Sequence, residues 1–187
     1  MKRSAAVVAL ALLLAPIASA RAATLAGVAV PDSQIVGDQA LTLSGVALRT
    51  KYIFKVYVAA LYLKDKQSDA AAILDRDSAR RMEMHFLRSL SAAQICEGWK
   101  EGLAANSPQA GPDLVKAFDD LCAAMAPVAE GAKLTLTYVP GLGTAVEIGG
   151  KAGPVFPGKP FADALLGCWI GPKPGPGEDF KRALLAP

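Results

Sequence analysis

The stretch from Gly45 to Lys64, GVALRTKYIFKVYVAALYLK, constrains the fold more than any other part of the chain. From Val56 to Leu63, residues of both parities are apolar or aromatic, which is typical of a strand covered on both faces. Before Val56, basic and aromatic residues alternate: Arg49, Lys51 and Lys55 against Tyr52 and Phe54. This alternation indicates a strand with one solvent-exposed face and one buried face. We therefore expect a single long strand through the middle of a sheet, with Arg49 where exposed turns to covered.

The remaining segments predict an α+β fold with a large, mainly antiparallel sheet and helices packed on one face. Alternating or apolar runs bounded by turn residues predict further strands at Thr24–Val30, Ala40–Leu43, Arg80–Leu87, Lys133–Val139, Thr144–Ile148 and Val155–Phe156. Apolar residues at helical spacing predict helices at Ala70–Asp75, from Ser89 or Ser91 to about Leu103, at Asp113–Met125 and at Phe161–Trp169.

The N-terminus carries the pattern of a secretory signal peptide. Lys2 and Arg3 precede an apolar run from Ala5 to Ala15, which is too short to span a bilayer, and small residues follow at a suitable cleavage site. We expect residues 1–22 to be removed and residues 23–187 to form a single domain without a membrane span. The expected location is outside the cytoplasm, in a bacterial periplasm.

Removal of the signal peptide changes the charge balance. The whole chain has 20 Lys and Arg residues against 17 Asp and Glu, and three of the cations are Lys2, Arg3 and Arg21. Subtracting these three from 20 leaves 17 cations against 17 acids. The mature net charge therefore gives no reason to expect a nucleic-acid partner or an anionic membrane surface.

Three cysteines allow at most one internal disulfide. Cys96 and Cys122 fall in consecutive predicted helices and could pair, which would contribute roughly 3 kcal/mol to stability. Cys168 lies beside Trp169 in an apolar run and is expected to be a buried thiol. The alternative is that all three cysteines are buried and reduced.

Motifs for hydrolysis, metal binding and phosphate binding do not stand out. The only histidine, His85, lies on the charged parity of its strand with Arg81 and Glu83, and we expect it to be solvated. No residues are spaced as a catalytic triad, a metal cluster or a glycine-rich phosphate loop. We therefore expect no metal and no cofactor.

Arg49 and Tyr57 are the candidate binding residues of the predicted long strand. They share a parity but are eight residues apart, about 27 Å along an extended strand. In this geometry they line one elongated groove rather than clamp a single anion. Arg49 would anchor a carboxylate or phenolate. The alternative is a solvated arginine beside Lys51 and Lys55.

Four segments together resemble the chalcone isomerase-like family, in its bacterial exported branch. They are Ser44–Lys64, Phe86–Leu103, Leu134–Lys151 and Phe161–Pro174, in the order found in that family. The resemblance implies an open-faced β-sandwich, in which a large antiparallel sheet is covered by helices and a ligand cleft lies between the layers.

The resemblance also implies roles for three residues. Arg49 matches the cleft arginine, which holds the phenolate of a chalcone during ring closure in the enzymes. In fatty-acid-binding members an arginine and a tyrosine hold the carboxylate, and Tyr57 matches that tyrosine, where the enzymes have a threonine. Gln94 stands where the enzymes have an asparagine. Their cleft tyrosine is missing from Leu87–Leu90, and their late threonine has no match near Gly150.

Three functions follow as hypotheses. The first is an exported, non-catalytic binder of a small amphipathic, fatty-acid-like acid between the sheet and the helices, with Arg49, Tyr57 and Gln94 as ligand-binding residues. Its partner would be a small amphipathic carboxylate or phenolic ligand. The second is an isomerase of the chalcone type, in which Arg49 would be catalytic. The third is a structural or interaction module without a ligand. The sequence does not indicate an oligomeric state.

Overall fold

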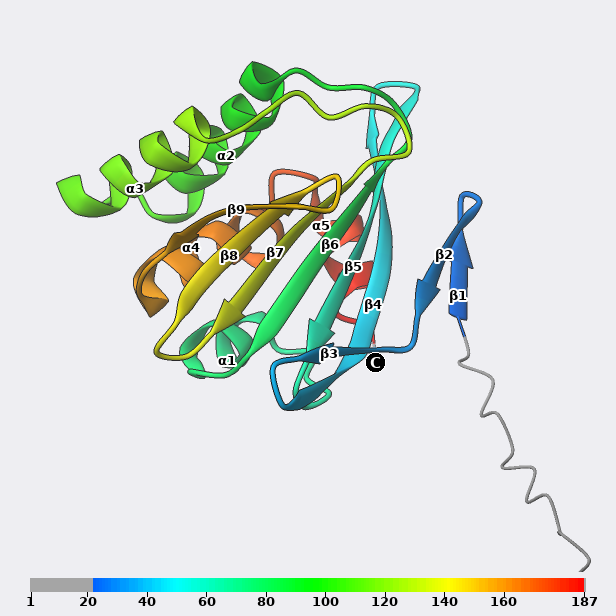
Figure 1. Cartoon of the computed structure of the whole chain (residues 1–187), viewed down its shortest axis with the longest axis horizontal. Helices are drawn as coiled ribbons and strands as arrows, with labels where there is room; N and C mark the ends of the chain where they lie inside the picture. The colour runs from blue at the N-terminus through cyan, green and yellow to red at the C-terminus, as the bar shows by residue number, and fades with distance from the viewer. Residues whose placement is uncertain (1–21, 187) are drawn as a thin grey trace, which may run out of the picture.

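The computed structural model describes residues 22–186, so the predicted signal peptide lies outside the described residues except for Ala22. The elements, in chain order, are β1 (Ala22–Leu25), β2 (Val28–Pro31), β3 (Ser33–Val36), β4 (Gln39–Lys51), β5 (Phe54–Leu63), α1 (Ala70–Asp75), β6 (Arg80–Phe86), α2 (Ala92–Asn106), α3 (Pro112–Ala123), β7 (Lys133–Val139), β8 (Gly143–Ile148), β9 (Lys151–Phe156), α4 (Lys159–Ile170) and α5 (Glu178–Leu184) (Figure 1). The predicted α+β class is confirmed.

The main sheet has seven strands in the order β3-β4-β5-β6-β7-β8-β9, and every neighbouring pair is antiparallel. In Figure 1 the sheet curls, and α4 and α5 lie behind it. A separate hairpin, β1–β2, lies beside β4. Because each strand pairs with the next one in the sequence, short turns connect most of the sheet.

Strand β5 is apolar on both faces because both faces are covered, as its sequence predicts. Ala59, Leu61 and Leu63 belong to the main core, which the helices share. Val58, Ala60 and Tyr62 belong to a smaller core on the opposite face, together with side chains of the first strands. The Tyr62 hydroxyl donates to the carbonyl of Pro31 at 3.0 Å, which ties β2 to this second face.

The prediction of one strand from Gly45 to Lys64 is wrong. The segment folds back at Tyr52 and Ile53, so that Lys51 pairs with Phe54 across a two-residue turn between β4 and β5. Such tight turns usually carry Gly, Asn or Asp where φ is positive. Here Tyr52 itself adopts a φ of 57°, so the sequence contains no ordinary turn signal. The aromatic side chains of Tyr52 and Phe54, which were expected on a buried face, are exposed at the tip of the hairpin.

The first predicted strand is also wrong, and one predicted solvated position is buried. Thr24–Val30 is broken by a turn at Ala26 and Gly27, both with positive φ. On β6, Glu83 is only 1% exposed although it shares a parity with Arg81 and His85. Its carboxylate lies 2.8 Å from Nε of Arg81 and 3.4 Å from Nε2 of His85. Burial opposes ionisation, but the nearby His85 and the neighbouring cations outweigh it and lower the pKa of Glu83.

Candidate ligand-binding site

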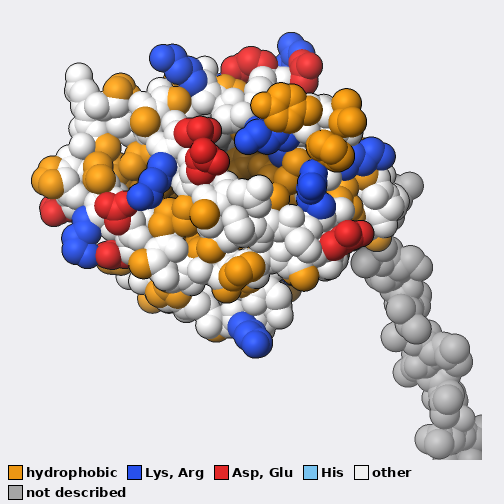
Figure 2. Space-filling view, turned by 90° about the horizontal axis from the view of Figure 1, so that it is seen from above, with side chains coloured by type: hydrophobic (Ala, Val, Ile, Leu, Met, Phe, Trp, Pro, Cys, Tyr) orange, Lys and Arg blue, Asp and Glu red, His pale blue; other side chains and the backbone are white. Residues whose placement is uncertain are grey.

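A cavity of about 380 Å³ lies between the helix-side face of the sheet and the helices. Its walls come from the β4–β5 hairpin, β6, α2, α4 and the loop after α4. Apolar side chains line much of it, including Val56, Met84, Ile95 and Trp99. Figure 2, which looks down on the hairpin end of the molecule, shows a hollow with hydrophobic, basic and acidic side chains around it. The cavity is therefore open at this end.

Arg49 and Tyr57 lie directly opposite each other across the β4–β5 pair, and both line the cavity. Directly opposed residues in an antiparallel pair have Cβ atoms only about 4.5–5.5 Å apart. The expected separation of about 27 Å along one strand is thus wrong, because the chain reverses between the two residues. The pair can act together on one small group.

A β-bulge at Val56 brings these two side chains to the same face. Near the turn, Thr50 pairs with Lys55, whereas the next pair is Arg49 with Tyr57, which leaves Val56 as an extra residue on β5. Without that extra residue the regular register would pair Arg49 with Val56. Tyr57 would then point to the opposite face of the sheet, because a shift of one residue reverses the side chains of a strand.

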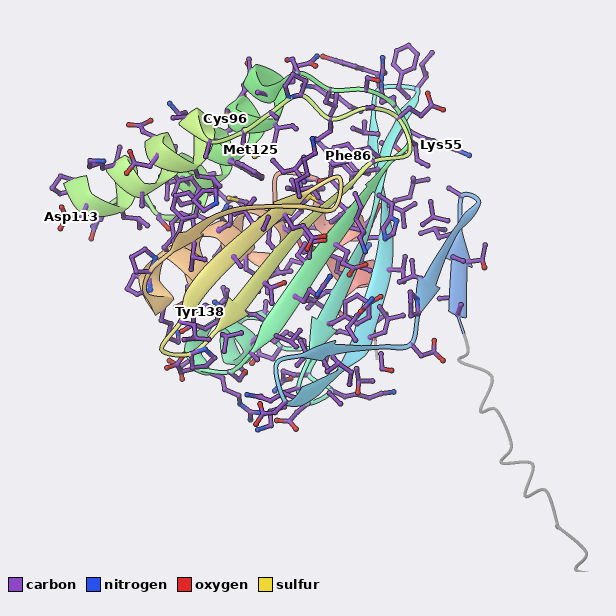
Figure 3. All side chains as sticks on the ribbon, viewed as in Figure 1. Lys55, Phe86, Cys96, Asp113, Met125 and Tyr138 are labelled. Carbon is purple, nitrogen blue, oxygen red and sulfur yellow. A yellow bond between two sulfur atoms is a disulfide. The ribbon has the colours of Figure 1, made fainter. Side chains whose placement is uncertain are left out.

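The Tyr57 ring is fixed on several sides. The indole nitrogen of Trp169 donates a hydrogen bond of 2.9 Å to the Tyr57 hydroxyl oxygen. The ring makes edge-to-face contacts with Phe86 and Phe180, with centroids 5.6 and 6.1 Å apart; Figure 3 labels Phe86. Burial raises the pKa of Tyr57 to about 12, against the opposing effects of the Trp169 hydrogen bond and the Arg49 charge. The phenol therefore keeps its proton at neutral pH and can donate it.

Neither cavity-facing donor is used within the described part of the chain. The Tyr57 hydroxyl accepts from Trp169, but its own proton has no acceptor among residues 22–186. The guanidinium of Arg49 likewise has no carboxylate within 4.0 Å in that range. Two free donors at one point, one of them charged, are suited to an oxyanion.

Gln94 lines the cavity mouth, but part of its side chain has a structural role. It is the third residue of α2, and its Oε1 accepts from the backbone nitrogen of Ser91 at 3.0 Å, in a capping box. The carbonyl oxygen of the Gln94 side chain is therefore occupied. A contact between Gln94 and a ligand through its amide NH₂ stays a prediction.

Several cavity residues were not singled out from the sequence. Trp169 contacts a tyrosine 112 positions away, and no local pattern indicates such a contact. Lys51 and Phe54 lie together at the cavity mouth because the chain turns at Tyr52, and Arg88 reaches the cavity from the loop after β6. The misread turn therefore concealed this part of the site.

The structure joins Cys96 of α2 to Cys122 of α3 by a disulfide, with Cα atoms 5.4 Å apart. Cys168 is free, buried and part of the cavity wall, and burial raises the pKa of its thiol to about 12. A thiol with so high a pKa is a poor nucleophile at neutral pH.

Within residues 22–186, no three His, Cys, Asp or Glu side chains gather as metal ligands. No helix in that range has the length and apolar character needed to cross a membrane.

Comparison with known proteins agrees with this architecture. A fatty-acid binding protein from Arabidopsis thaliana has a similar crystal structure, with a TM-score of 0.68 and 16% identity over 88% of this chain and 96% of the plant chain. At this identity the likeness concerns the fold. A sequence search of curated proteins found no match. The model of a family described as chalcone isomerase-like matches residues 22–186. The chain therefore belongs to the chalcone isomerase-like family.

Proposed function

We propose that this protein binds a small amphipathic carboxylic acid of the fatty-acid type and does not transform it. The observation that carries the proposal is the pairing of Arg49 with Tyr57 in an open, largely apolar cavity, with both donors unused by the described chain. The guanidinium would bind the carboxylate and the neutral phenol would donate a second hydrogen bond. The similarity of fold to a plant fatty-acid binding protein supports this choice of ligand.

The size and lining of the cavity support a modest ligand. Its volume of about 380 Å³ is near the lower end of the usual range for small-molecule sites, about 300–1,000 Å³. Val56, Ile95 and Trp99 offer apolar contact to an alkyl chain beyond the head group. A medium-chain acid is therefore a better candidate than a long one.

Two features favour binding over ring closure. The residue opposite Arg49 is a tyrosine, where the resemblance implies a threonine in the enzymes. Gln94, at the position of the enzymes' asparagine, uses its side-chain oxygen to cap α2. Ring closure needs the reacting atoms to be held in line, beyond the neutralisation of an oxyanion, and these residues do not supply the expected set.

The proposed location is a bacterial periplasm, after export and removal of residues 1–22. The basic start at Lys2 and Arg3, followed by the short apolar run, supports this proposal. The test is to express the full chain in a bacterium and to determine the N-terminal residue of the protein released from the periplasm. A full-length chain retained in the cytoplasm would contradict it.

Thermal unfolding in the presence of fatty acids tests the proposed class of ligand. The acids have 6 to about 16 carbons, a range on both sides of the medium-chain size that the cavity volume suggests. At 100 times Kd a ligand stabilises the folded state by about 2.7 kcal/mol, so the unfolding temperature of the wild type should rise. Arg49→Ala should abolish the rise, whereas Lys64→Ala, one residue beyond the far end of β5, should retain it. Equal shifts for Arg49→Ala and wild type, or no shift with any acid, would overturn the proposal.

A chalcone provides the enzymatic comparison. The protein is incubated with the chalcone while its visible absorbance is followed, with Arg49→Ala as the control. We expect the same slow loss of absorbance for both proteins. A faster loss with wild type than with Arg49→Ala would instead support an isomerase.

A further inference from the structure

The tip of the β4–β5 hairpin exposes large apolar side chains to solvent. Tyr52 is 88% exposed, Ile53 86% and Phe54 52%. Within residues 22–186 these three make up almost half of the exposed large hydrophobic residues; the other four, Ile35, Val115, Leu142 and Val155, are separate in the sequence. Contiguous exposed apolar residues indicate a contact surface rather than ordinary surface scatter.

The stability of the turn does not explain why Tyr52 and Ile53 occupy it. Tyr52 adopts a positive φ of 57°, a conformation in which Gly or Asn is better accommodated. Neither Tyr52 nor Ile53 is buried in the core. Bulky apolar residues in a strained, exposed turn therefore indicate a role in contact with a binding partner.

Cations surround the same tip. Lys51 and Lys55 flank the three apolar residues, and Arg88 lies with its guanidinium carbon 4.7 Å from the centroid of the Phe54 ring. None of these three cations has a carboxylate within 4.0 Å in the described part of the chain. Figure 3 shows Lys55 pointing outward from the hairpin. Residues 23–187 have no net charge overall, so these three cations, unpaired within residues 22–186, make the tip locally basic.

The tip is also part of the cavity mouth. Lys51, Tyr52, Phe54 and Arg88 all line the cavity, and α2 adds two acids to the lining, Glu97 and Glu101. Basic and hydrophobic side chains gather at this opening in Figure 2. A surface that contacts the tip would therefore also face the entrance.

We propose that the hairpin tip docks on an anionic lipid bilayer, with Tyr52, Ile53 and Phe54 in the interface and Lys51, Lys55 and Arg88 on the head groups. Aromatic and aliphatic residues flanked by basic ones are suited to this position, because the apolar side chains leave water while the cations meet negative charge. Docking in this way would let an amphipathic acid pass between the bilayer and the cavity; this last step alone rests on the proposed function.

The test uses vesicles of phosphatidylglycerol and phosphatidylcholine, with pure phosphatidylcholine as the uncharged control. Two residues of the tip, Ile53 and Lys55, do not line the cavity, so Ile53→Asp/Lys55→Glu can reduce docking without changing the binding site. We expect this variant to lose at least about tenfold in affinity for the anionic vesicles. Added salt should weaken the binding of wild type.

The matched control is Leu142→Asp/Lys64→Glu. These residues are at the end of the sheet that Tyr138 marks in Figure 3: Lys64 follows Leu63, which is aligned across β6 with Tyr138, and Leu142 lies in the turn between β7 and β8. Leu142 is 73% exposed. Loss of affinity in the control equal to that of the tip variant would overturn the proposal, as would undiminished binding by the tip variant. A dimer of wild type that Ile53→Asp dissociates, without vesicle binding, would instead assign the tip to a second copy of the chain.

A tryptophan placed at the tip reports on contact between the tip itself and the bilayer, whether or not the N-terminal segment also binds vesicles. Trp99 and Trp169 are buried, so Ile53→Trp adds an exposed indole, and its emission should shift to shorter wavelength with anionic vesicles. Leu142→Trp should show no shift. Decanoate binding to the tip variant, measured by thermal shift, is scored separately. If wild type binds vesicles but no acid, the proposed function fails and the docking stands; if it binds acid but no vesicles, the docking fails alone.

Discussion

The indole nitrogen of Trp169 and the hydroxyl oxygen of Tyr57 are joined by a hydrogen bond of 2.9 Å across 112 positions of the chain. The bond connects α4 to β5, and so connects the helical layer to the sheet at the cavity. An indole can only donate. The Tyr57 hydroxyl is therefore the acceptor, and its own proton remains for a ligand. A packing contact between the layers thus also orients a binding group.

We expect the two residues to be energetically coupled. Tyr57→Phe leaves the buried Trp169 N–H without its partner and should cost about 1–3 kcal/mol of unfolding free energy. The double variant Trp169→Phe/Tyr57→Phe removes both polar groups. Its loss of unfolding free energy should be smaller than the sum of the losses in Trp169→Phe and Tyr57→Phe. Urea unfolding of the four proteins measures this, and strict additivity would contradict the coupling.

Ligand affinity should respond to the same pair. Tyr57→Phe removes one donor to the carboxylate, so the Kd for decanoate should rise by at least about tenfold, the lower limit for a hydrogen bond to a charged group. Trp169→Phe should have a smaller effect because the phenol is still present. Calorimetric titration with Lys64→Ala as a control checks the order of these effects.

The raised pKa of Tyr57 predicts a loss of stability at alkaline pH. Its value changes from 10.0 to about 12 on folding, chiefly because of burial. Below pH 10 both states hold the proton and stability is unaffected; between pH 10 and 12 the unfolded state releases it first, so stability falls as pH rises. A shift of this size corresponds to about 2–3 kcal/mol.

The comparison of wild type with Tyr57→Phe isolates the part of the alkaline loss of stability that is due to Tyr57. Tyr62 and Tyr138 have similarly raised pKa values and remain in both proteins, so their contributions cancel. The free energy of unfolding should fall less steeply between pH 10 and 12 in the variant. Parallel curves for the two proteins would show that Tyr57 is not the group responsible.

The disulfide between Cys96 and Cys122 should stabilise the helical layer. It closes a loop with a sequence separation of 26 residues, for which loop entropy gives about 3–4 kcal/mol. Reducing agent should lower the unfolding temperature of wild type and leave that of Cys96→Ala/Cys122→Ala unchanged. An equal response in both proteins would mean that the bridge does not form.

Much of the fold could be predicted because the local patterns are strong. The strand Lys133–Val139 begins and ends at the predicted residues. The helix after β6 begins where the capping pattern of Ser91 indicates. In both segments the spacing of apolar residues agrees with the surface that the segment buries, so sequence and tertiary structure give the same answer.

The candidate site was only partly predictable, for a reason specific to the turn. Arg49 and Tyr57 were selected from the sequence, but their distance was wrong because a two-residue turn at Tyr52 has no glycine, asparagine or proline. An extra residue at Val56 then shifts the register. Parity holds only within an uninterrupted strand, so counting positions across this turn and bulge could not place the pair.

Burial of a charged residue was equally difficult to foresee. Glu83 has the alternation of a solvent-facing position, and only the tertiary structure shows its contacts with Arg81, His85 and Lys133. Charged residues are rarely buried unless paired, and the partner Lys133 is on a different strand. The periodicity of β6 alone therefore indicates the wrong environment.

A close contact between β4 and α5 provides the last prediction. A Cβ atom added at Gly45 would lie 2.2 Å from the carbonyl oxygen of Ala183 and 2.6 Å from that of Leu184. Both obstacles are backbone atoms, so α5 would have to move away from the sheet. Gly45→Ala should therefore lower the free energy of unfolding by about 1–3 kcal/mol, the usual cost of overpacking. Gly98→Ala is the control, because nothing lies within 4 Å of its added Cβ and alanine favours the helix by up to about 1 kcal/mol. Urea unfolding of both variants should give changes of opposite sign, and a stabilised Gly45→Ala would contradict the packing of α5 on β4.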